Sequence, residues 1–386
     1  MSKIGPVSRA ATRPGRPAVS WSFAASGALL LAVAIACQRS TRPVRIAVAS
    51  LARNDAVAFM AADDVNARGG IRGRPLLVVH DTIPVDAEPI DLEIRRAQYL
   101  VAQRPVAVVG HGGSRGSLAA APIYNEARVL QLVPTGTSRL LARAGPWTLP
   151  LVPNDSVEGE FIARFVRDEL RARTVAIFYV SDEYGVGLRD GVRAALGPAV
   201  QVVREQRYGL GSDLHTLMDA TVRGGAPDVI VVAGREAATS TIVRRLVELG
   251  LPSRVVAGDG AVVLPDLPRG AGPGAEGRLF AATFWLPTSP DTASQRFARA
   301  VQQRLLREAT ATDALVYDAV GVLATALRKV GDDPTDVRNY VLSLGRSRPR
   351  YRGVTGEIGF GAGAGPARLV MARVRGQSLV PAGQSR

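Results

Sequence analysis

Cysteine, histidine and lysine are scarce in this 386-residue chain. Cys37 is the only cysteine, so no disulfide can form within the chain, and no zinc-ligand spacing or cysteine–histidine nucleophile pair is present. The three histidines, His80, His111 and His215, lie far apart. All but two of the 48 basic residues are arginines, dispersed along the chain. Proteins that bind nucleic acid gather such charge to follow phosphates, so the net charge of +14 does not indicate a nucleic-acid partner.

Apolar residues are plentiful by comparison. Hydrophobic residues make up 47% of the chain and charged residues 21%, which supplies enough material for a packed core. This composition excludes intrinsic disorder and collagen-like repeats. At ~100–200 residues per domain, the length predicts two domains.

The chain begins with a basic segment, Lys3 to Arg16, and carries no acidic residue before Cys37. An apolar run follows at 23–36, interrupted only by Ser26. This run is too short to cross the ~30 Å hydrocarbon layer of a membrane, but it suits the core of a signal peptide. We therefore predict a signal peptide at residues 1–36 and a polar tether at residues 37–43.

Small residues immediately precede Cys37, and this pattern resembles the bacterial lipobox, in which the cysteine receives lipid. We therefore predict lipidation at Cys37 and a membrane-anchored protein of the periplasm or cell envelope. The position three before the cysteine, usually aliphatic, is Ala34 here. The alternative is ordinary cleavage at Ala32-Val33-Ala34, which would release the protein into the periplasm.

The remaining chain alternates between short apolar runs and segments with helical periodicity. Strand-like runs occupy 44–49, 76–81, 106–110, 130–134, 174–180, 201–208, 229–233, 254–258 and 369–374, and helical patterns occupy 55–68, 91–103, 114–128, 156–170, 184–196, 214–223, 236–249, 294–306, 311–330 and 335–344. Continuous apolar strands between helices predict parallel sheet covered on both faces. One sheet of this length is unusual, so we expect two doubly wound α/β lobes, with crossings at 150–153, 283–287 and 353–365.

A series of short motifs resembles one known family in order and position. The motifs are Asn66-Ala-Arg-Gly-Gly-Ile-Arg-Gly-Arg-Pro75 with the following strand to Asp81, Val109-Gly-His-Gly-Gly-Ser114, Pro134-Thr-Gly-Thr137, Ser181-Asp-Glu-Tyr-Gly-Val-Gly187, Gly258-Asp-Gly260, Tyr317-Asp-Ala-Val320 and Gly353-Val-Thr-Gly-Glu-Ile-Gly-Phe360. Together they resemble the type I periplasmic binding proteins of the branched-chain amino-acid (Leu/Ile/Val-binding) transporter class. The resemblance extends roughly from Val44 to Val374.

The resemblance implies two doubly wound Rossmann-like lobes joined by a three-strand hinge. The first lobe would comprise residues 44–152 plus 285–352, and the second residues 153–284 plus 353–380. It also implies a non-enzymatic protein, without cofactor or metal, that closes over a small ligand in the cleft. That ligand would be an amino acid or related carboxylate, and the partner an ABC permease.

The first-lobe residues implied by the resemblance follow predicted strands. Ser114 and Thr137 would hold the α-carboxylate of the ligand, helped by main-chain N–H groups near Gly136 and by the neighbouring Thr135. Ser114 opens a predicted helix, whose free N–H groups favour an anion. Purely structural roles stay open, because Ser114 also suits an N-cap and the threonines suit loop residues that bond their own backbone.

In the second lobe, the resemblance implies that Tyr184 packs against the ligand and that Asp259 receives its α-ammonium. Both residues also suit turns. Two departures from the family affect the pocket. The first loop, 50–55, is shorter than usual, and Arg235 stands where an aromatic or small residue is common. Arg235 either accepts a ligand carboxylate or pairs with Glu236 or Asp259 and leaves the pocket.

Other functions fit parts of the same sequence. Residues 112–116 satisfy G-x-S-x-G, which would make Ser114 the nucleophile of an esterase, but His215 is the only downstream histidine and begins a predicted helix. The glycines at 110–116 approach a dinucleotide-binding loop, but Arg115 replaces its last glycine and the expected acid is missing. A ligand-sensing or enzyme-docking envelope lipoprotein of the same fold is the main alternative.

Overall fold

The computed structural model describes residues 1–2, 5, 42–49, 52–81, 83, 89–209, 211–360 and 368–383. The predicted signal peptide, Cys37 and most of the tether therefore lie outside the described residues, apart from a few terminal positions. Within the described part, no helix has both the length and the apolar character needed to cross a membrane.

Five parallel strands form the first sheet, in the spatial order β2-β1-β3-β4-β5. They are β1 (Val44–Ala49), β2 (Leu76–His80), β3 (Ala107–Gly110), β4 (Leu130–Val133) and β5 (Thr148–Pro150). The strand order reverses between β1 and β3, which is the topological switch point of a doubly wound sheet. Ligands bind beyond the carboxyl ends of the strands at such a point.

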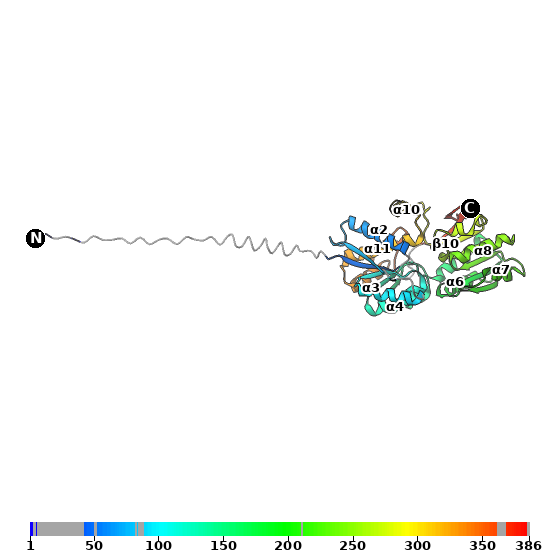
Figure 1. Ribbon diagram of the computed structural model, residues 1–386, viewed down its shortest axis with the longest axis horizontal. Coiled ribbons are helices and arrows are strands. Elements are labelled where there is room, and N and C mark those ends of the chain that lie inside the picture. The colour runs from blue at the N-terminus through cyan, green and yellow to red at the C-terminus, as the bar shows by residue number, and fades with distance from the viewer. Residues whose placement is uncertain are drawn as a thin grey trace. The chain divides into compact units, whose positions relative to one another are not determined.

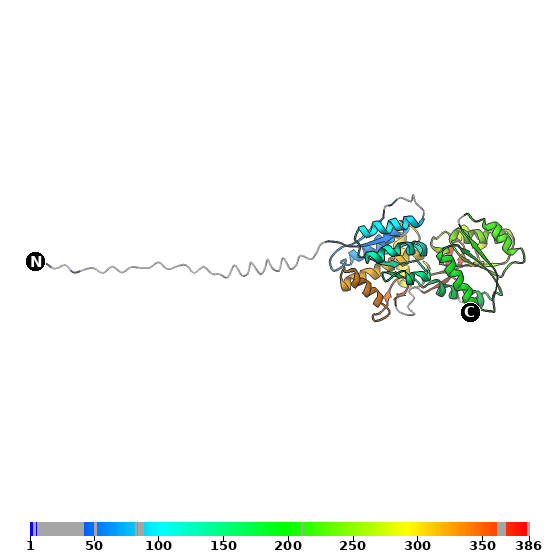
Figure 2. The same ribbon diagram turned by 90° about the horizontal axis from the view of Figure 1, so that it is seen from below.

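Helices cover both faces of this sheet, because successive side chains of its apolar strands point in opposite directions. Ala47 and Val108 face α3 (Pro89–Ala102) and α4 (Gly113–Ala127). Ile46 and Val109 face the opposite side, covered by α2 (Ala52–Ala67), α11 (Ala311–Val330) and α12 (Pro334–Ser343). Figure 2 shows the orange helices from late in the chain beside the blue strands of its beginning.

The remaining elements near this sheet also come from late in the chain. Helix α10 (Thr292–Leu305) packs its Phe297 and Val301 against Val57 and Met60 of α2. The short strands β11 (Tyr351–Arg352) and β12 (Glu357–Ile358) pair with each other. Ile358 packs in the core on the face of the sheet that α2, α11 and α12 cover. We call the five-stranded sheet with its helices the first lobe.

Seven strands form the second sheet, in the order β14-β13-β10-β9-β8-β6-β7. They are β6 (Thr174–Val180), β7 (Gln201–Tyr208), β8 (Val229–Ala233), β9 (Arg254–Ala257), β10 (Leu279–Thr283), β13 (Val370–Arg375) and β14 (Ser378–Pro381). The strands from β6 to β10 are parallel, whereas β13 and β14 are antiparallel to their neighbours. This sheet and its helices form the second lobe.

The second sheet is also covered on both faces (Figure 1). One face carries α5 (Asp155–Arg164), its π-helical extension η2 (Phe165–Glu169) and α6 (Glu183–Leu196). The other face carries α7 (Leu214–Val222), α8 (Glu236–Glu248), α9 (Leu267–Ala271) and the short turns η3 (Asp259–Val262) and η4 (Pro273–Ala275).

The chain passes between the two sheets three times: after β5, after β10 and between β12 and β13. Residues 361–367 of the third passage lie outside the described residues. The predicted fold class, two doubly wound α/β lobes with three connections, is thus confirmed.

Three sequence expectations need correction. The predicted single strand at 369–374 is one arm of the β13–β14 hairpin; β14 was missed because it has only four residues and ends in proline. Strand β10 was not predicted, because its apolar run continues into the expected crossing at 283–287. The predicted helix 156–170 changes at Phe165 from α to π geometry.

Helices α5 and α6 approach each other closely because glycines face the contact. A Cβ atom at Gly159 of α5 would collide with the main chain of Gly191 on α6. A Cβ at Gly187 would collide with the carboxylate of Asp155. This tight packing fixes the position of α5, which carries two buried acids described below.

Substitution Gly159→Ala should lower the free energy of unfolding by about 1–3 kcal/mol, because the added methyl overpacks a contact that the main chain cannot relax. Urea unfolding followed by circular dichroism measures the change. Gly224→Ala is the matched control, since a Cβ at Gly224 meets nothing within 4 Å; this change should stay within about 0.5 kcal/mol. Equal effects of the two substitutions would contradict the packing argument.

Candidate functional site

A cavity of about 430 Å³ lies where strands of both sheets end. The first lobe lines it with the end of β1 and with the loops that follow β3 and β4. The second lobe lines it with the first turn of α6 and with the segments that follow β8 and β9. Parallel strands buried on both faces expose only their ends, so polar side chains gather at this edge.

Most of the predicted site residues reach this cavity. Ser114 and Thr135 line it from the first lobe, and Tyr184, Arg235 and Asp259 line it from the second. Gly136 and Thr137 instead line a second cavity of about 630 Å³, together with Arg139 and Arg338. Their part in ligand binding stays a prediction.

Ser114 is buried in the first turn of α4 and is not the N-cap, which is Gly112. Its Oγ accepts hydrogen bonds from the main-chain N–H groups of Thr137 (3.2 Å) and Ser138 (3.1 Å). These two bonds hold the loop after β4 against α4. Because a hydroxyl accepts two bonds and donates one, the hydrogen of Ser114 is left for a partner in the cavity.

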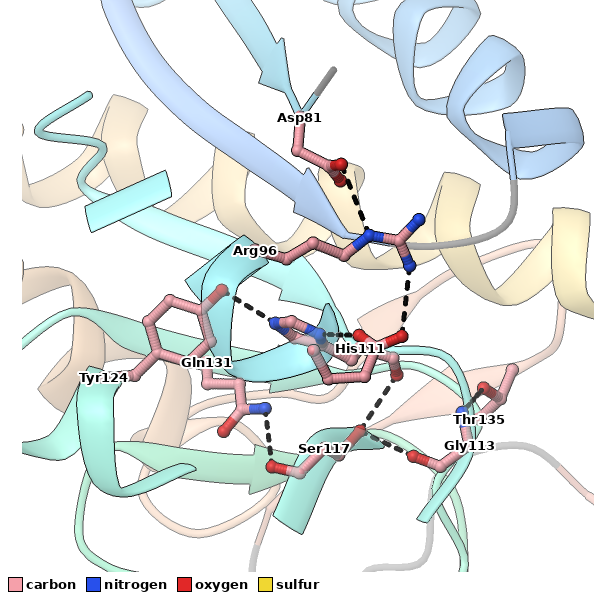
Figure 3. Close-up of polar contacts among 9 residues, drawn as sticks. Asp81, Arg96, His111, Gly113, Ser117, Tyr124, Gln131 and Thr135 are labelled. Carbon is pink, nitrogen blue, oxygen red and sulfur yellow. Dashed lines mark hydrogen bonds and ion pairs between the residues drawn. The ribbon is translucent and has the colours of Figure 1, made fainter. Parts of the chain in front are cut away.

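The loop that precedes α4 is fixed in a similar way. The main-chain N–H of Gly113 donates to Thr135 Oγ1 at 3.1 Å, which joins the loops after β3 and β4 (Figure 3). Ser117 Oγ lies within hydrogen-bond distance of the carbonyl oxygens of His111 (2.9 Å) and Gly113 (2.7 Å). The first-lobe wall is therefore built before any ligand arrives.

A buried polar network supports this wall from behind (Figure 3). His111 is fully buried, and its Nε2 lies 2.8 Å from the hydroxyl of Tyr124. Its Nδ1 contacts the carboxylate of Glu93, which also accepts a bond from Arg96 Nη1 at 3.1 Å. Arg96 Nε in turn donates to Asp81 at 3.3 Å.

Two members of this network, Glu93 and Arg96, line the cavity itself. Burial acts to raise the pKa of Glu93, but the hydrogen bond and charge of His111 and the charge of Arg96 outweigh it and hold this pKa below its usual value. Sequence reasoning missed both residues. The only available signal was an acid and an arginine three residues apart on the predicted helix 91–103.

Arg235 lies at the second-lobe wall, but its partner differs from both expected acids. Its Nη2 donates to Asp182 Oδ2 at 3.0 Å, and its guanidinium carbon lies 4.7 Å from the ring centre of Tyr184. Glu236 instead accepts a bond from Ser240. The expectation that Arg235 pairs with Glu236 or Asp259 and leaves the pocket is therefore wrong.

Asp259 lies at the start of η3 and is fixed by a residue distant in sequence. Its main-chain N–H donates to Glu158 Oε1 on α5 at 2.7 Å. The next N–H, of Gly260, donates to the hydroxyl of Tyr184 at 2.9 Å. Within the described part of the chain, Asp259 Oδ1 and Glu158 Oε2 are buried atoms without a hydrogen-bond partner.

Three acids therefore lie close together behind the second-lobe wall. Burial is the main cause that raises the pKa of Glu158 well above its usual value, and the charge of Asp259 adds to it. Burial likewise raises the pKa of Asp259. Burial raises the pKa of Asp155 to about 7, with a contribution from the charge of Asp259. Sequence reasoning missed Asp155 and Glu158, although their spacing places them on one helix face.

An esterase with Ser114 as its nucleophile would need a histidine nearby as general base. Among the described residues that line the cavity, none is a histidine, and His215 lies in the first turn of α7. Nor do any three His, Cys, Asp or Glu side chains of the described chain converge in a way that would hold a metal ion. The first-lobe wall presents Ser114 and the Glu93–Arg96 pair, and the second-lobe wall presents Arg235 and Asp259.

Comparison with known families agrees with this geometry. A family model described as "Periplasmic binding protein" matches residues 47–378, which is most of the chain. The chain is a type I periplasmic binding protein. The resemblance identified from the loop motifs is thus confirmed.

Two relatives of this periplasmic binding protein carry related names. The "Amino acid binding protein" of Pseudomonas aeruginosa is 29% identical over 208 residues, which is 53% of this chain and only 55% of that protein. The "Leu/Ile/Val-binding protein homolog 1" of Brucella suis is 25% identical over 305 residues, 78% of this chain and 79% of that protein.

A solved structure shows the same fold as this periplasmic binding protein. It is the branched-chain amino acid transporter substrate binding protein LivJ from Streptococcus pneumoniae, in complex with isoleucine. The TM-score is 0.77 at 21% identity, and the match covers 88% of this chain and 98% of that one. At this identity the similarity establishes the two-lobed fold.

Asp155→Asn should change how the stability of this binding protein depends on pH. The folded pKa of about 7 lies above the unfolded value near 3.8, so the folded state holds a proton that the unfolded state has lost between these values. The stability that Asp155 contributes is thus fully present below the lower value and lost as pH rises through the higher one. Over this pH range, the variant should lose less free energy of unfolding than the wild type, by up to about 4 kcal/mol.

Urea unfolding at several pH values between these limits measures the effect. Asp336→Asn, at an exposed position on α12, is the control and should leave the pH slope unchanged. If Asp155→Asn and the wild type lose the same free energy of unfolding over this range, Asp155 is ionised in the folded protein and the argument fails.

Proposed function

We propose that this protein is the extracytoplasmic substrate-binding protein of an ABC transporter, and that it binds an amino acid or related carboxylate in the 430 Å³ cavity. One observation carries the proposal. Residues from both lobes place a hydrogen-bond donor, Ser114, and an acid, Asp259, in the walls of one cavity. A zwitterion presents the complementary pair of charges.

On the first-lobe side, the ligand's carboxylate would accept the hydrogen of Ser114 and lie near the N-terminus of α4. Unpaired N–H groups at a helix N-terminus favour negative charge. Thr135 would border the same group. Gly136 and Thr137, which line the neighbouring cavity, would act through the main chain of their loop.

On the second-lobe side, Asp259 would receive the ligand's ammonium and Tyr184 would pack against the ligand. Opposite charges ~4 Å apart attract by roughly 4 kcal/mol at an effective dielectric of ~20, before desolvation. Arg235 would cover the entrance, since it stacks on Tyr184 and bonds to Asp182.

A small ligand can supply enough binding free energy in such a site. For about nine heavy atoms the ceiling is near −13 kcal/mol, and micromolar affinity needs only about −8 kcal/mol. The two lobes would close about the three connections to exclude water, with the third boundary after Ile358, which packs in the first-lobe core, and not after residue 352 as predicted. An ABC permease would then bind the protein with its two lobes closed. Lipid on Cys37 would keep the protein at the membrane.

The alternative is a ligand-sensing or enzyme-docking lipoprotein of the periplasm or cell envelope with the same fold. Arg235 favours it to the extent that a cation at the cavity entrance alters the usual pocket. The two functions differ in whether free amino acids stabilise the purified protein.

Asp259→Asn should weaken binding of an amino acid by about 100-fold or more, because a buried charge-assisted hydrogen bond contributes about 3 kcal/mol. The probe is the L-amino acid of the common twenty that most raises the melting temperature of the wild type, measured by calorimetric titration. The acid that lacks only its amino group should bind the wild type as weakly as the amino acid binds the variant.

Glu248→Gln is the matched control for this titration, because Glu248 lies on α8 outside the cavity and pairs with Arg245. It should bind the amino acid with wild-type affinity. Absence of any thermal shift in the wild type across the twenty amino acids would favour the docking lipoprotein over the transporter subunit.

Lipidation of Cys37 is tested by expressing the chain with its own leader in a Gram-negative bacterium. The mature protein should begin at Cys37, carry the mass of attached acyl chains and sediment with membranes, whereas Cys37→Ser should not be processed to this form. An unmodified N-terminus generated immediately after Ala34, found by mass spectrometry, would show that the leader is simply cleaved.

A further inference from the structure

Glu158 is a fully buried acid that none of the roles above requires. It lies on α5, does not line the cavity, and meets the site through the main-chain N–H of Asp259, 101 residues away in sequence. The close packing of α5 on α6 holds it there. An ionisable group buried beside a second acid is costly unless it carries a proton or has a specific partner.

We propose that Glu158 is a positioning residue that holds a proton behind Asp259, directs the ionised Asp259 toward the ligand's ammonium, and releases part of that proton when the ammonium binds. The inference rests on the proposed function, since it specifies which ligand group the site selects. Ligands with a protonated amine would be bound with proton release, and carboxylates without an amine would not.

The hydrogen-bond geometry places the proton. Glu158 Oε1 already accepts from the N–H of Asp259, so this oxygen is the carbonyl-like one. Glu158 Oε2 and Asp259 Oδ1 are both buried and both without a donor in the described part of the chain. The two carboxyl groups are within hydrogen-bonding reach of each other, so a single proton on Glu158 can be shared with Asp259 and satisfy both side chains. Two ionised carboxylates would leave both atoms unsatisfied.

The charges around Glu158 support the same assignment. Asp155 on α5 and Asp259 on η3 are both negative when ionised, and each makes ionisation of Glu158 harder. Tyr184, which packs from α6, is neutral at physiological pH because burial raises its pKa. No cation acts directly on Glu158 among the described residues. The charge of Arg235, which bonds to Asp182, favours the ionised form of Asp259 and so leaves the proton on Glu158, while Arg139 acts on Asp155.

An ammonium in the cavity changes this balance. Before binding, the pair of acids holds one proton and one negative charge. After binding, the ammonium lies beside Asp259, the ionised form of Glu158 is favoured, and its proton passes to the buffer. Because the complex holds fewer protons than the free protein, affinity should rise with pH below the range in which the ligand's own amine titrates.

The decisive experiment is calorimetric titration near pH 7 in phosphate and in Tris, two buffers that differ in ionisation enthalpy. The probe is the tightest-binding amino acid from the panel above. The difference in observed heat gives the number of protons released, which should be a clear fraction of one for the wild type. Glu158→Gln keeps the Oε1 acceptor but cannot titrate, so the release should fall close to zero and the affinity should become nearly independent of pH.

Asp155→Asn tests whether the released proton comes from Glu158 or from its buried neighbour Asp155. It should retain more than half of the wild-type proton release. Loss of the release in Asp155→Asn, unchanged release in Glu158→Gln, or no release by the wild type would each overturn the proposal.

Infrared spectroscopy provides a test that needs no ligand. A protonated carboxylic acid has a distinct C=O stretching band. Because Asp155 is also partly protonated near neutral pH, the contribution of Glu158 is the difference between the ligand-free wild type and Glu158→Gln, and the wild type should show the stronger band. The band should also weaken in the wild type when the amino acid is added, a measurement that requires no variant. If no amino acid binds, the proposed function fails, while the ligand-free band still decides the protonation of Glu158; an identical band in Glu158→Gln would refute it.

Discussion

Strands buried on both faces leave only their ends accessible, and this constraint places the residues at the centre of the proposed site. In the first lobe the ends of β3 and β4 carry the loops that hold Ser114 and Thr135. In the second lobe the ends of β8 and β9 carry Arg235 and Asp259. Because the two sheets direct these ends at one cavity, residues from two independent cores can act on one ligand.

The two walls differ in how their polar groups are satisfied. On the first-lobe side, hydrogen bonds from Thr137 and Ser138 to Ser114, and from Gly113 to Thr135, hold the loops in place. The His111 network adds charges that are paired with each other. On the second-lobe side, Glu158 and Asp259 keep unsatisfied oxygens. One wall is rigid and electrically balanced, whereas the other stores the charge imbalance that an ammonium would relieve.

The sequence alone determined the fold class and much of the site, because both depend on local pattern. Strands at 174–180 and 229–233 were predicted with the observed bounds, since apolar runs between helices have few other solutions. The more polar strand 201–208 was also predicted with its observed bounds, from its place between two predicted helices. The positions of Ser114 and Asp259 just beyond β3 and β9 followed from the predicted strand ends. In a parallel sheet, a residue just after a strand must lie at the ligand-binding edge.

Only the tertiary structure decided which side chains meet. Glu158 reaches Asp259 across 101 residues, Arg235 pairs with Asp182 in place of the nearer Glu236, and Thr137 turns toward a different cavity. Side-chain direction and burial depend on how helices pack on the sheet, and that packing joins segments remote in sequence. For the same reason, the raised pKa values of Asp155 and Glu158 arise from desolvation that exists only in the folded chain.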